Sequence, residues 1–253
     1  PPRSTLFPYT TLFRSELMGI RENLEDIIEQ KNRAAADAGR TPEEILLCAV
    51  TKTRMPDEIN EAIKWGVTDI GENKVQEILD KFDKVLPVRW HLIGHLQTNK
   101  VKYIVDKVSM IHSVDSLHLA QEIDRRCSQA GKTMDILIQV NSAEEESKFG
   151  IKTGETGQLI EDILRICPNL RIKGLMCIAP YLEDPEAVRG YFREVKQLYD
   201  TYSKVEHPNL DFQYLSMGMS HDYKAAIYEG SNLIRIGTAI FGERNYGNRI
   251  QEV

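Results

Sequence analysis

The sequence has no long hydrophobic run and no excess of positive charge. Apolar stretches such as Ile45–Val50 are only a few residues long, far short of the roughly 20 apolar residues that cross a bilayer. The 32 Lys and Arg residues are outnumbered by 38 Asp and Glu residues, which gives a formal net charge of −6. Such a chain offers no broad basic field to attract nucleic acid. We therefore expect neither a membrane-spanning segment nor a nucleic-acid partner.

Cysteine is scarce and is never paired in the sequence. The chain has four cysteines, and none of them forms a C-x-x-C motif. Cys48 and Cys177 lie inside apolar runs, where a cysteine usually behaves as a small hydrophobic residue. This usage predicts reduced thiols and a cytoplasmic protein.

Familiar catalytic and nucleotide-binding motifs are also absent. The chain contains no G-x-S-x-G elbow, no Walker loop and no dinucleotide-binding glycine fingerprint. His91 and His95 have the i, i+4 spacing of a helical metal site, but they fall in a predicted strand followed by a turn. Without a neighbouring Glu or Cys cluster, these histidines predict no metal site.

The first residues differ in character from the rest of the chain. Pro1–Ser15 contain no acidic residue and lack the apolar centre of a secretion signal. The stretch from Thr5 to Ser15 resembles the in-frame translation of a widely used sequencing adapter. We expect residues 1–15 to be a non-native extension and residues 16–253 to form one domain. A genuine extension is the alternative, and the genomic sequence at the 5′ end of the gene distinguishes the two.

Beyond this extension, short apolar runs alternate with amphipathic stretches. The pattern over Ile20–Ala38 predicts a first helix. The apolar runs predict strands at Ile45–Val50, Val67–Ile70, Val88–Ile93, Met110–Val114, Met134–Val140, Ile172–Cys177, Phe212–Leu215 and Leu233–Ile236. The stretches between them predict helices at Pro56–Trp65, Lys74–Phe82, Ser116–Ala130, Gly157–Ile166, Pro185–Tyr202 and Tyr223–Glu229.

This alternation predicts an α/β fold, a single (β/α)8 barrel with an extra N-terminal helix. A doubly wound open sheet is the structural alternative, although it would normally have fewer strands or a clear domain division. The sequence has no linker rich in Pro, Gly or Ser, no internal repeat and no low-complexity segment. Because a barrel binds its ligands at the carboxyl ends of the strands, the residues that follow each strand are the candidates for function.

Lys52 is the most informative of these residues. It follows the predicted strand Ile45–Val50 and lies between two threonines. A partly buried lysine at this position can lower its pKa and form a Schiff base with an aldehyde. The alternative is a strand-end lysine whose amine simply reaches solvent. Lys148, in a turn after the fifth predicted strand, fits better as a solvated loop lysine.

Two later strand ends predict a phosphate-binding cup. The segment Ser216–Ser220 follows the seventh predicted strand and leads into a helix, and Gly237 and Thr238 follow the eighth. Hydroxyl groups and the free N–H groups of a helix start are suited to phosphate, and barrels often hold phosphate at these strand ends. Ordinary helix capping by Ser220 and a tight turn at Gly237 are the alternative.

Arg235 places a charge inside the apolar run Leu233–Ile236. An unpaired buried charge is costly, so this guanidinium needs a partner. The sequence leaves two kinds of partner open: a structural carboxylate, or the phosphate or ring nitrogen of a ligand.

Several of these segments together resemble the pyridoxal phosphate homeostasis proteins. The matching segments, in the same order as in that family, are Ala49–Thr53, Gly71–Glu77, Trp90–Gln97, Gly174–Met176, Leu215–Ser220 and Ile234–Gly242. The resemblance extends from Ile20 to the C-terminus. It implies a barrel like the N-terminal domain of alanine racemase (PLP fold type III), carrying pyridoxal 5′-phosphate (PLP).

The resemblance also implies roles for individual residues. Lys52 matches the lysine that forms the Schiff base with PLP. The remaining matches are Ser216, Ser220, Gly237 and Thr238 in the phosphate-binding region, Arg235 approaching the cofactor, Asn73 near its ring, and Lys148 as a secondary cofactor-handling lysine of some members.

The family comparison further predicts what the protein does with PLP. Alanine racemase has a second, C-terminal β domain that supplies an opposite-face base in a dimer, and we expect that domain to be absent because the sequence ends at Val253. Racemisation needs acid–base groups on both faces of the substrate carbon. We therefore expect a monomer that buffers PLP and passes it to apo-enzymes without efficient catalysis. The alternatives are a PLP-dependent amino-acid racemase of low activity and a phosphate-binding barrel without a Schiff base.

Overall fold

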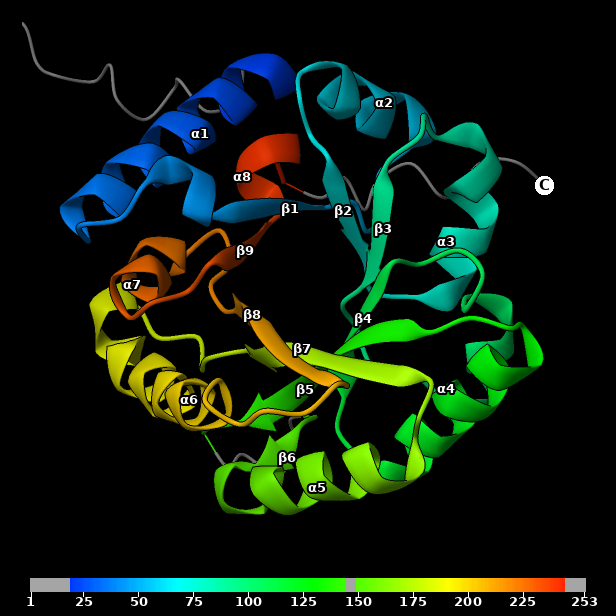
Figure 1. Cartoon of the computed structure of the whole chain (residues 1–253). Coiled ribbons are helices and arrows are strands. Elements are labelled where there is room, and N and C mark those ends of the chain that lie inside the picture. Colours follow the sequence, from blue (N-terminus) through cyan, green and yellow to red (C-terminus); the bar gives the residue numbers. More distant parts are fainter. Residues whose placement is uncertain (1–18, 144–148, 244–253) are drawn as a thin grey trace, which may run out of the picture.

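The chain folds into a closed parallel β-barrel surrounded by helices (Figure 1). The computed structural model describes residues 19–143 and 149–243. Neighbouring strands follow the order β4-β3-β2-β1-β9-β8-β7-β5, and a further pairing of β4 with β5 closes the sheet. The predicted (β/α)8 barrel is therefore confirmed.

The barrel strands coincide with the predicted apolar runs. They are β1 (Leu46–Val50), β2 (Asp69–Glu72), β3 (Arg89–Leu92), β4 (Met110–Val114), β5 (Met134–Asn141), β7 (Leu170–Cys177), β8 (Leu210–Ser216) and β9 (Leu233–Ile236). β2 begins later than its apolar run because Val67 still belongs to the preceding helix end, where its N–H donates to Ala62 O. One short strand was not predicted: β6 (Ile151–Lys152) pairs with the end of β5 and is too short to show a periodic pattern.

The main helices also follow the predictions. They are α1 (Ile20–Asp37), α2 (Pro56–Lys64), α3 (Val75–Lys81), α4 (Leu117–Gln129), α5 (Thr156–Ile166), α6 (Arg189–Tyr202) and α7 (Tyr223–Tyr228). Short helices complete the ring and were not predicted as such: α8 (Thr238–Phe241) and the 3₁₀ helices η1 (Pro42–Glu44), η2 (Phe82–Lys84), η3 (Thr98–Tyr103), η4 (Thr153–Glu155) and η5 (Pro185–Val188). The stretch predicted as one helix from Pro185 is therefore divided into η5 and α6.

The extra N-terminal helix, α1, lies beside α2, α7 and α8 in the outer layer (Figure 1). Its buried apolar residues Leu24, Ile27, Ala34 and Ala35 recur at the spacing of one helix face. None of the helices in the described ranges is long and apolar enough to cross a membrane.

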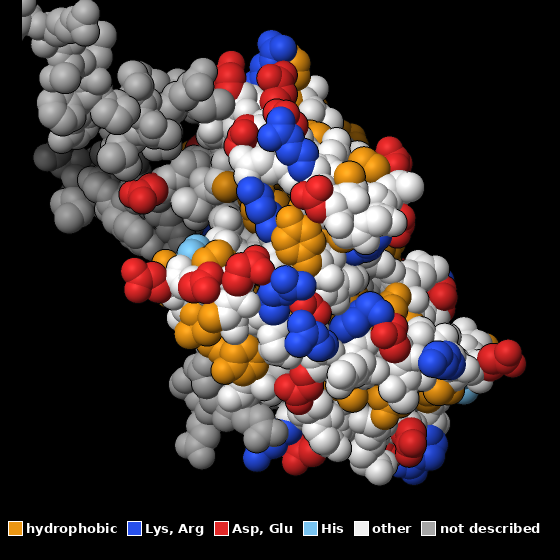
Figure 2. All heavy atoms as spheres, turned by 90° about the vertical axis from the view of Figure 1, so that its left-hand side faces the viewer, with side chains coloured by type: hydrophobic (Ala, Val, Ile, Leu, Met, Phe, Trp, Pro, Cys, Tyr) orange, Lys and Arg blue, Asp and Glu red, His pale blue; other side chains and the backbone are white. Residues whose placement is uncertain are grey.

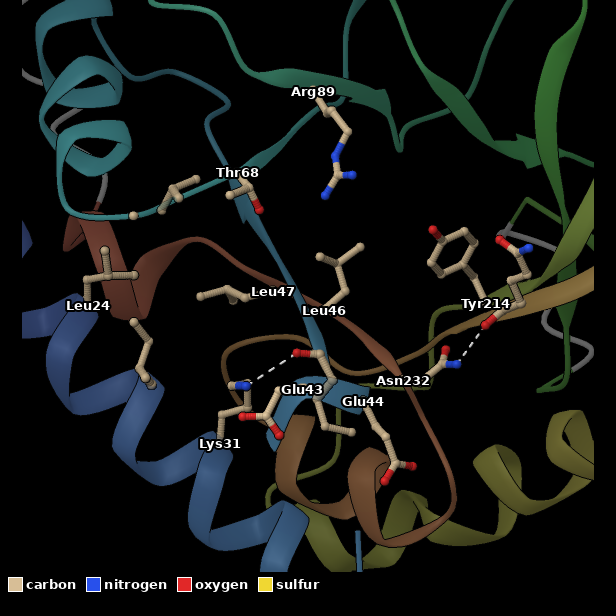
Figure 3. A pocket seen from close by; sticks show the side chains of 15 residues that line it. Leu24, Lys31, Glu43, Glu44, Leu46, Leu47, Thr68, Arg89, Tyr214 and Asn232 are labelled. Carbon is tan, nitrogen blue, oxygen red and sulfur yellow. Dashed lines mark hydrogen bonds between the residues drawn. The ribbon is translucent and has the colours of Figure 1, made fainter. Parts of the chain in front are cut away.

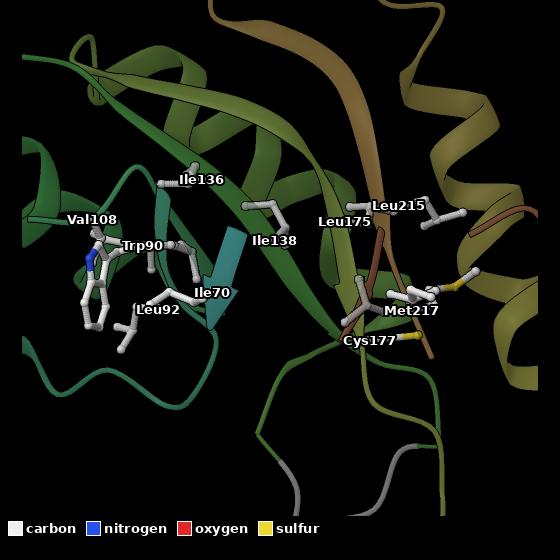
Figure 4. Close-up of a cluster of buried hydrophobic side chains, with 14 of the residues drawn as sticks. Ile70, Trp90, Leu92, Val108, Ile136, Ile138, Leu175, Cys177, Leu215 and Met217 are labelled. Atoms are coloured by element: carbon white, nitrogen blue, oxygen red, sulfur yellow. The ribbon is translucent and has the colours of Figure 1, made fainter. Parts of the chain in front are cut away.

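The hydrophobic core lies mainly between the sheet and the helices. Ile136 and Ile138 of β5 belong to this large outer cluster (Figure 4), whereas Leu137 between them joins a small cluster with Met110 and Met176. Successive side chains of a strand point to opposite faces. Because of the same alternation, polar side chains can also point into the barrel at other positions along its axis. All four cysteines are buried and unpaired, which confirms the reduced thiols.

The outer surface of the helix layer carries charges of both signs. Figure 2 shows Lys and Arg side chains interspersed with Asp and Glu side chains over the face formed by the left-hand side of Figure 1. Arg189 and Arg193, for example, both pair with Glu229. On this face the opposite charges lie side by side and form no continuous basic surface.

The packing of α6 against the sheet predicts a large stability loss when its main apolar contact is removed. Phe192 of α6 has 0 % of its surface exposed. We expect Phe192→Ala to lower the free energy of unfolding by about 3–5 kcal/mol, because it leaves a cavity that the surroundings cannot fill. Urea denaturation measures this loss. Leu86→Ala, at a side chain 40 % exposed, is the control, with an expected change below about 1 kcal/mol. Equal losses for the two variants would contradict this packing.

Candidate functional site

A cavity of about 430 Å³ opens at the carboxyl end of the barrel, between the loops that follow β1, β7, β8 and β9. Its lining brings together five residues that the sequence singled out: Lys52, Ser220, Arg235, Gly237 and Thr238. The lining is completed by Val50, Arg54, Tyr181, Met219 and His221. β9 pairs with β1 on one side and with β8 on the other. This adjacency explains why segments far apart in the sequence form one cavity.

Lys52 reaches this cavity because of the alternation of side chains along β1. Val50 and Lys52 both line the cavity, whereas Thr51 between them is buried on the opposite side, where its hydroxyl donates to Glu72 Oε1 at 2.7 Å. The amine of Lys52 is therefore presented from the inner wall of the barrel. Partial burial of an amine at such a position favours its uncharged, nucleophilic form.

Ser220 and the start of α8 form a cluster of hydrogen-bonding groups in the same cavity. The hydroxyl of Ser220 accepts from the backbone N–H groups of Gly237 at 3.3 Å and Ala239 at 3.4 Å. Gly218, in the same loop, has a φ of +90°, and an added Cβ there would lie 2.8 Å from Tyr223 Cα. The glycine therefore allows the loop to approach α7 closely. These N–H groups and hydroxyls can receive an anionic group that enters the cavity.

Arg235 is buried, with 3 % of its surface exposed, at the inner edge of the cavity. Its Nη1 donates to Ser216 Oγ at 2.5 Å and its Nη2 to the Cys177 carbonyl oxygen at 2.8 Å. No carboxylate of the described residues lies within ion-pair distance of it. Burial lowers the pKa of Arg235, and the more distant Asp222 raises it. The positive charge is thus held by neutral acceptors, which leaves it available to an anionic or basic group of a ligand.

Ser216 does not line the cavity, although the sequence placed it in the phosphate-binding segment. It is fully buried, and its hydroxyl lies 3.2 Å from His112 Nδ1 while accepting from Arg235. Behind it, His112 Nε2 lies 2.9 Å from His91 Nδ1, and His91 Nε2 lies 2.8 Å from Asp69 Oδ1. A chain of hydrogen bonds therefore runs through the barrel interior from Arg235 to Asp69.

The two ends of this chain fix the direction of its terminal hydrogen bonds. An arginine can only donate and an ionised aspartate can only accept, so Arg235 donates to Ser216 and His91 Nε2 donates to Asp69. Burial alone would raise the pKa of Asp69, but hydrogen bonds from His91, Arg89 and Thr68 outweigh it and lower the pKa to about 2. Burial also lowers the pKa of His112 well below its usual value. His112 is therefore neutral inside the barrel.

Of the remaining candidates from the sequence, Asn73 is not among the residues that line the cavity. Asn73 follows β2, and its backbone is so close to Gly94 that a Cβ on that glycine would lie 2.3 Å from the Asn73 carbonyl oxygen. The side-chain Oδ1 of Asn73 is buried and accepts no hydrogen bond from the described residues. Lys148 and residues 1–15 fall outside the described residues. No group of three metal-binding side chains occurs within residues 19–143 and 149–243.

The structure also adds lining residues that sequence reasoning missed. Arg54 lies two positions after Lys52, so the same alternation could have placed it beside the cavity; its guanidinium binds the carbonyl oxygens of Gly242 and Glu243. Tyr181 and His221 come from the loops after β7 and β8, with ring centroids 4.9 Å apart. Their side chains face each other only in the folded barrel, and no local pattern in the sequence indicates this.

The opposite, amino-terminal mouth of the barrel contains a second cavity of about 490 Å³ (Figure 3). Its two cationic side chains are bound within the protein. Lys31 Nζ donates to the carbonyl oxygens of Pro42 and Ile45, and Arg89 forms two hydrogen bonds with Asp69. Barrel enzymes place their active sites at the carboxyl ends of the strands, whereas the amino end mainly contributes to stability. We therefore place the functional site at the carboxyl end.

The neutral state of His112 predicts a specific dependence of stability on pH. Because its pKa is lowered in the folded protein, the unfolded chain binds the proton more readily, and stability falls as pH drops below about 6.5. The slope attributable to one such proton is at most about 1.4 kcal/mol per pH unit. We expect His112→Gln to remove this slope between pH 5 and pH 7 in urea titrations, and His118→Gln, on the exposed face of α4, to retain it. Imidazole NMR signals of His112 that titrate near pH 6.5 would contradict the assignment.

Comparisons with known proteins support the fold and show the family. The sequence profile of the family described as alanine racemase, N-terminal domain, matches residues 28–245. Proteins named pyridoxal phosphate homeostasis protein from Aquifex aeolicus and Escherichia coli K12 are 44 % and 38 % identical, over 90 % and 91 % of this chain and 100 % and 99 % of theirs. The solved structure of PipY from Synechococcus elongatus with PLP bound has a TM-score of 0.75 and 30 % identity, covering 88 % of this chain and 100 % of that one.

More distant structures share the fold alone. Alanine racemase from Clostridium difficile has a TM-score of 0.64 at 14 % identity, covering 88 % of this chain and 58 % of that one. The barrel therefore corresponds to part of the racemase and to nearly the whole length of the homeostasis proteins. The chain belongs to the alanine racemase N-terminal domain family and, within it, to the pyridoxal phosphate homeostasis proteins.

Proposed function

We propose that this protein binds PLP in the carboxyl-end cavity through a Schiff base on Lys52, and that it buffers the cofactor and delivers it to apo-enzymes. The observation that carries the proposal is the convergence of three groups in one cavity. An amine, a buried guanidinium without a carboxylate partner, and a cluster of N–H and hydroxyl groups all line it. The match to PipY covers all of PipY and 88 % of this chain, and PipY was solved with PLP bound. This similarity supports PLP as the ligand here.

The residues present fit the parts of PLP. The cofactor carries an aldehyde, a phosphate and a pyridine ring, and a cavity of about 430 Å³ lies within the usual size range of small-molecule sites. The Lys52 amine can condense reversibly with the aldehyde. The phosphate fits the wall formed by Ser220, Gly237 and Thr238, where backbone N–H groups point at a hydroxyl oxygen that a phosphate oxygen could replace.

The interior chain of hydrogen bonds supports Arg235 in this role. We assign Arg235 to the ring or phosphate of the cofactor and Ser216 to holding Arg235, since Ser216 accepts its Nη1–H and lies outside the lining. The chain continues from Ser216 to ionised Asp69, so Ser216 is itself held in place. Arg235 therefore stays oriented before any ligand enters. Asn73 remains a candidate at the ring, with its buried Oδ1 as the group that a ligand could bind.

The openness of the cavity favours a carrier over an efficient enzyme. Apart from Lys52, the side chains lining the cavity that could act as a base are Tyr181 and His221. Tyr181 is 82 % exposed, and His221 Nε2 is bound to the Leu182 carbonyl oxygen at 2.9 Å. Neither is a buried group facing a substrate carbon, and exposure of a site to solvent weakens electrostatic catalysis. A monomeric cytoplasmic carrier that meets apo-enzymes at this open mouth is the function we infer.

Lys52 is expected to be the only attachment point for PLP in the cavity. Purified protein mixed with PLP should be yellow, with an absorbance band at the visible edge that borohydride removes as it traps the adduct. We expect Lys52→Ala to abolish both the band and the trapped adduct, and Lys64→Ala, on the exposed side of α2, to keep them. Peptide mapping of the trapped protein identifies the lysine. A wild-type protein that gains no band with PLP would overturn the proposal.

Two measurements distinguish a carrier from a racemase: exchange of the substrate α-proton, and transfer of PLP to an apo-enzyme. With PLP-loaded protein and L-alanine in deuterated water, we expect no exchange of the α-proton above the rate of free PLP, because no second buried base lines the cavity among the described residues. The same loaded protein should reactivate an apo PLP enzyme in the presence of a scavenger that removes free PLP. Rapid exchange that depends on Lys52 would establish the racemase, and failure to reactivate under the scavenger would refute delivery.

A further inference from the structure

The loop that carries Lys52 adopts an unfavourable backbone conformation. Thr53 has a φ of +65°, and it is the one non-glycine residue of the described ranges with a positive φ. For a β-branched residue this region is a genuine outlier. Such strain costs of the order of 1–3 kcal/mol and persists only where surrounding contacts impose it. The contacts that hold this loop therefore prevent Thr53 from relaxing to a negative φ.

These contacts come from the helix-facing side of the barrel, opposite the cavity. Lys81 of α3 donates from its Nζ to the Thr51 carbonyl oxygen at 2.9 Å, and the Thr51 hydroxyl donates to Glu72 Oε1 at 2.7 Å. The Thr53 backbone N–H donates to Glu77 Oε2 at 2.6 Å. The residues on both sides of Lys52 are thus fixed from outside while the lysine itself faces inward.

Lys81 joins these contacts into one unit. Its ammonium group has three N–H donors, and they meet three acceptors: the Thr51 carbonyl oxygen, Glu72 Oε1 at 2.7 Å and Glu77 Oε2 at 2.7 Å. The exposed side-chain fractions are 9 % for Lys81, 0 % for Glu72 and 20 % for Glu77. Burying a lysine with two carboxylates is costly unless they pair closely, and here the pairing runs through Glu72 Oε1 while Glu72 Oε2 has no hydrogen-bond partner among the described residues. None of the three lines the cavity.

We propose that Glu72, Glu77 and Lys81 are positioning residues for Lys52: they hold Thr51 and Thr53 in the strained loop conformation that directs the Lys52 amine into the cavity. The proposal rests on the proposed function of Lys52. Without these contacts Thr53 relaxes to a negative φ, the turn after β1 changes direction, and the amine spends less time facing the ligand. The strain is then part of the pre-organisation of the site, because fewer conformations have to be excluded when the ligand binds.

Thr53→Gly tests the strain directly. Glycine adopts positive and negative φ with similar ease, so this variant folds and yet no longer confines the loop. We expect the melting temperature of the ligand-free protein to stay within the range of surface substitutions, whereas PLP affinity, measured by absorbance titration, falls about tenfold, equivalent to about 1.4 kcal/mol. Thr53→Asn, which tolerates a positive φ but restricts the chain, should restore most of the affinity.

Glu77→Leu tests the clamp itself, because it removes the acceptor of the Thr53 N–H and one partner of Lys81. We again expect about tenfold weaker PLP binding and slower formation of the borohydride-trapped adduct at Lys52. Glu44→Leu is the matched control, since Glu44 likewise accepts a backbone N–H, that of Thr41 at 2.8 Å, but lies at the other end of the barrel. It should leave PLP binding unchanged.

The outcomes separate the clamp from the function on which it depends. If wild-type protein forms no trapped adduct, the proposed function fails. If wild-type protein forms the adduct and both Thr53→Gly and Glu77→Leu bind PLP as tightly as it does, the clamp proposal alone is refuted. The clamp proposal is also refuted if Glu44→Leu and Glu77→Leu both lose PLP affinity in proportion to their loss of melting temperature. That result would show a general effect of stability.

Discussion

A positive charge buried inside the barrel, that of Arg235, organises the polar interior of this protein. A guanidinium away from water must be satisfied by other means, and here Ser216 and the Cys177 carbonyl oxygen accept its hydrogen bonds. The hydroxyl of Ser216 also lies against His112, and the chain of hydrogen bonds continues through His91 to Asp69. Asp222 acts on this charge from a distance and raises the pKa of Arg235, whereas Asp69 at the far end of the chain binds Arg89. The interior of the sheet is therefore polar along one path and apolar at the Met110, Leu137 and Met176 level.

The two faces of a strand explain how an accessible lysine amine can be held in a defined orientation. The inner face of β1 and its following loop presents Lys52 to the cavity. The outer face of the same segment is held by Glu72, Glu77 and Lys81. Because successive side chains alternate, a group that must stay accessible can be oriented by neighbours that never contact the ligand. The position of the amine thus depends on α3, an element whose sequence gives no direct indication of a ligand.

The sequence allowed the barrel to be predicted because parallel strands are buried on both faces and appear as short apolar runs. It also placed Lys52, Ser220, Arg235, Gly237 and Thr238 at strand ends, and these residues meet in one cavity. It could not separate Ser216 from Ser220, since both lie in one small segment and only the folded sheet shows that Ser216 turns toward His112, 104 residues away. Contacts of this range leave no local pattern. The same holds for Tyr181 and His221, whose loops meet only at the mouth.

The character of the mouth connects these features to function. A site that must perform proton transfer on both faces of a carbon benefits from closure, because exclusion of water strengthens every interaction inside it. A site that must release its cofactor to another protein needs the opposite arrangement. Its amine is oriented by residues outside the cavity and stays accessible from the mouth of the cavity. The carboxyl-end cavity has this second arrangement, with Tyr181 exposed at its rim and the loop of Lys52 held on the far side by buried charges. For the carrier function that we propose, orientation without enclosure favours a Schiff base that forms and exchanges readily, whereas a racemase built on the same barrel benefits from enclosure.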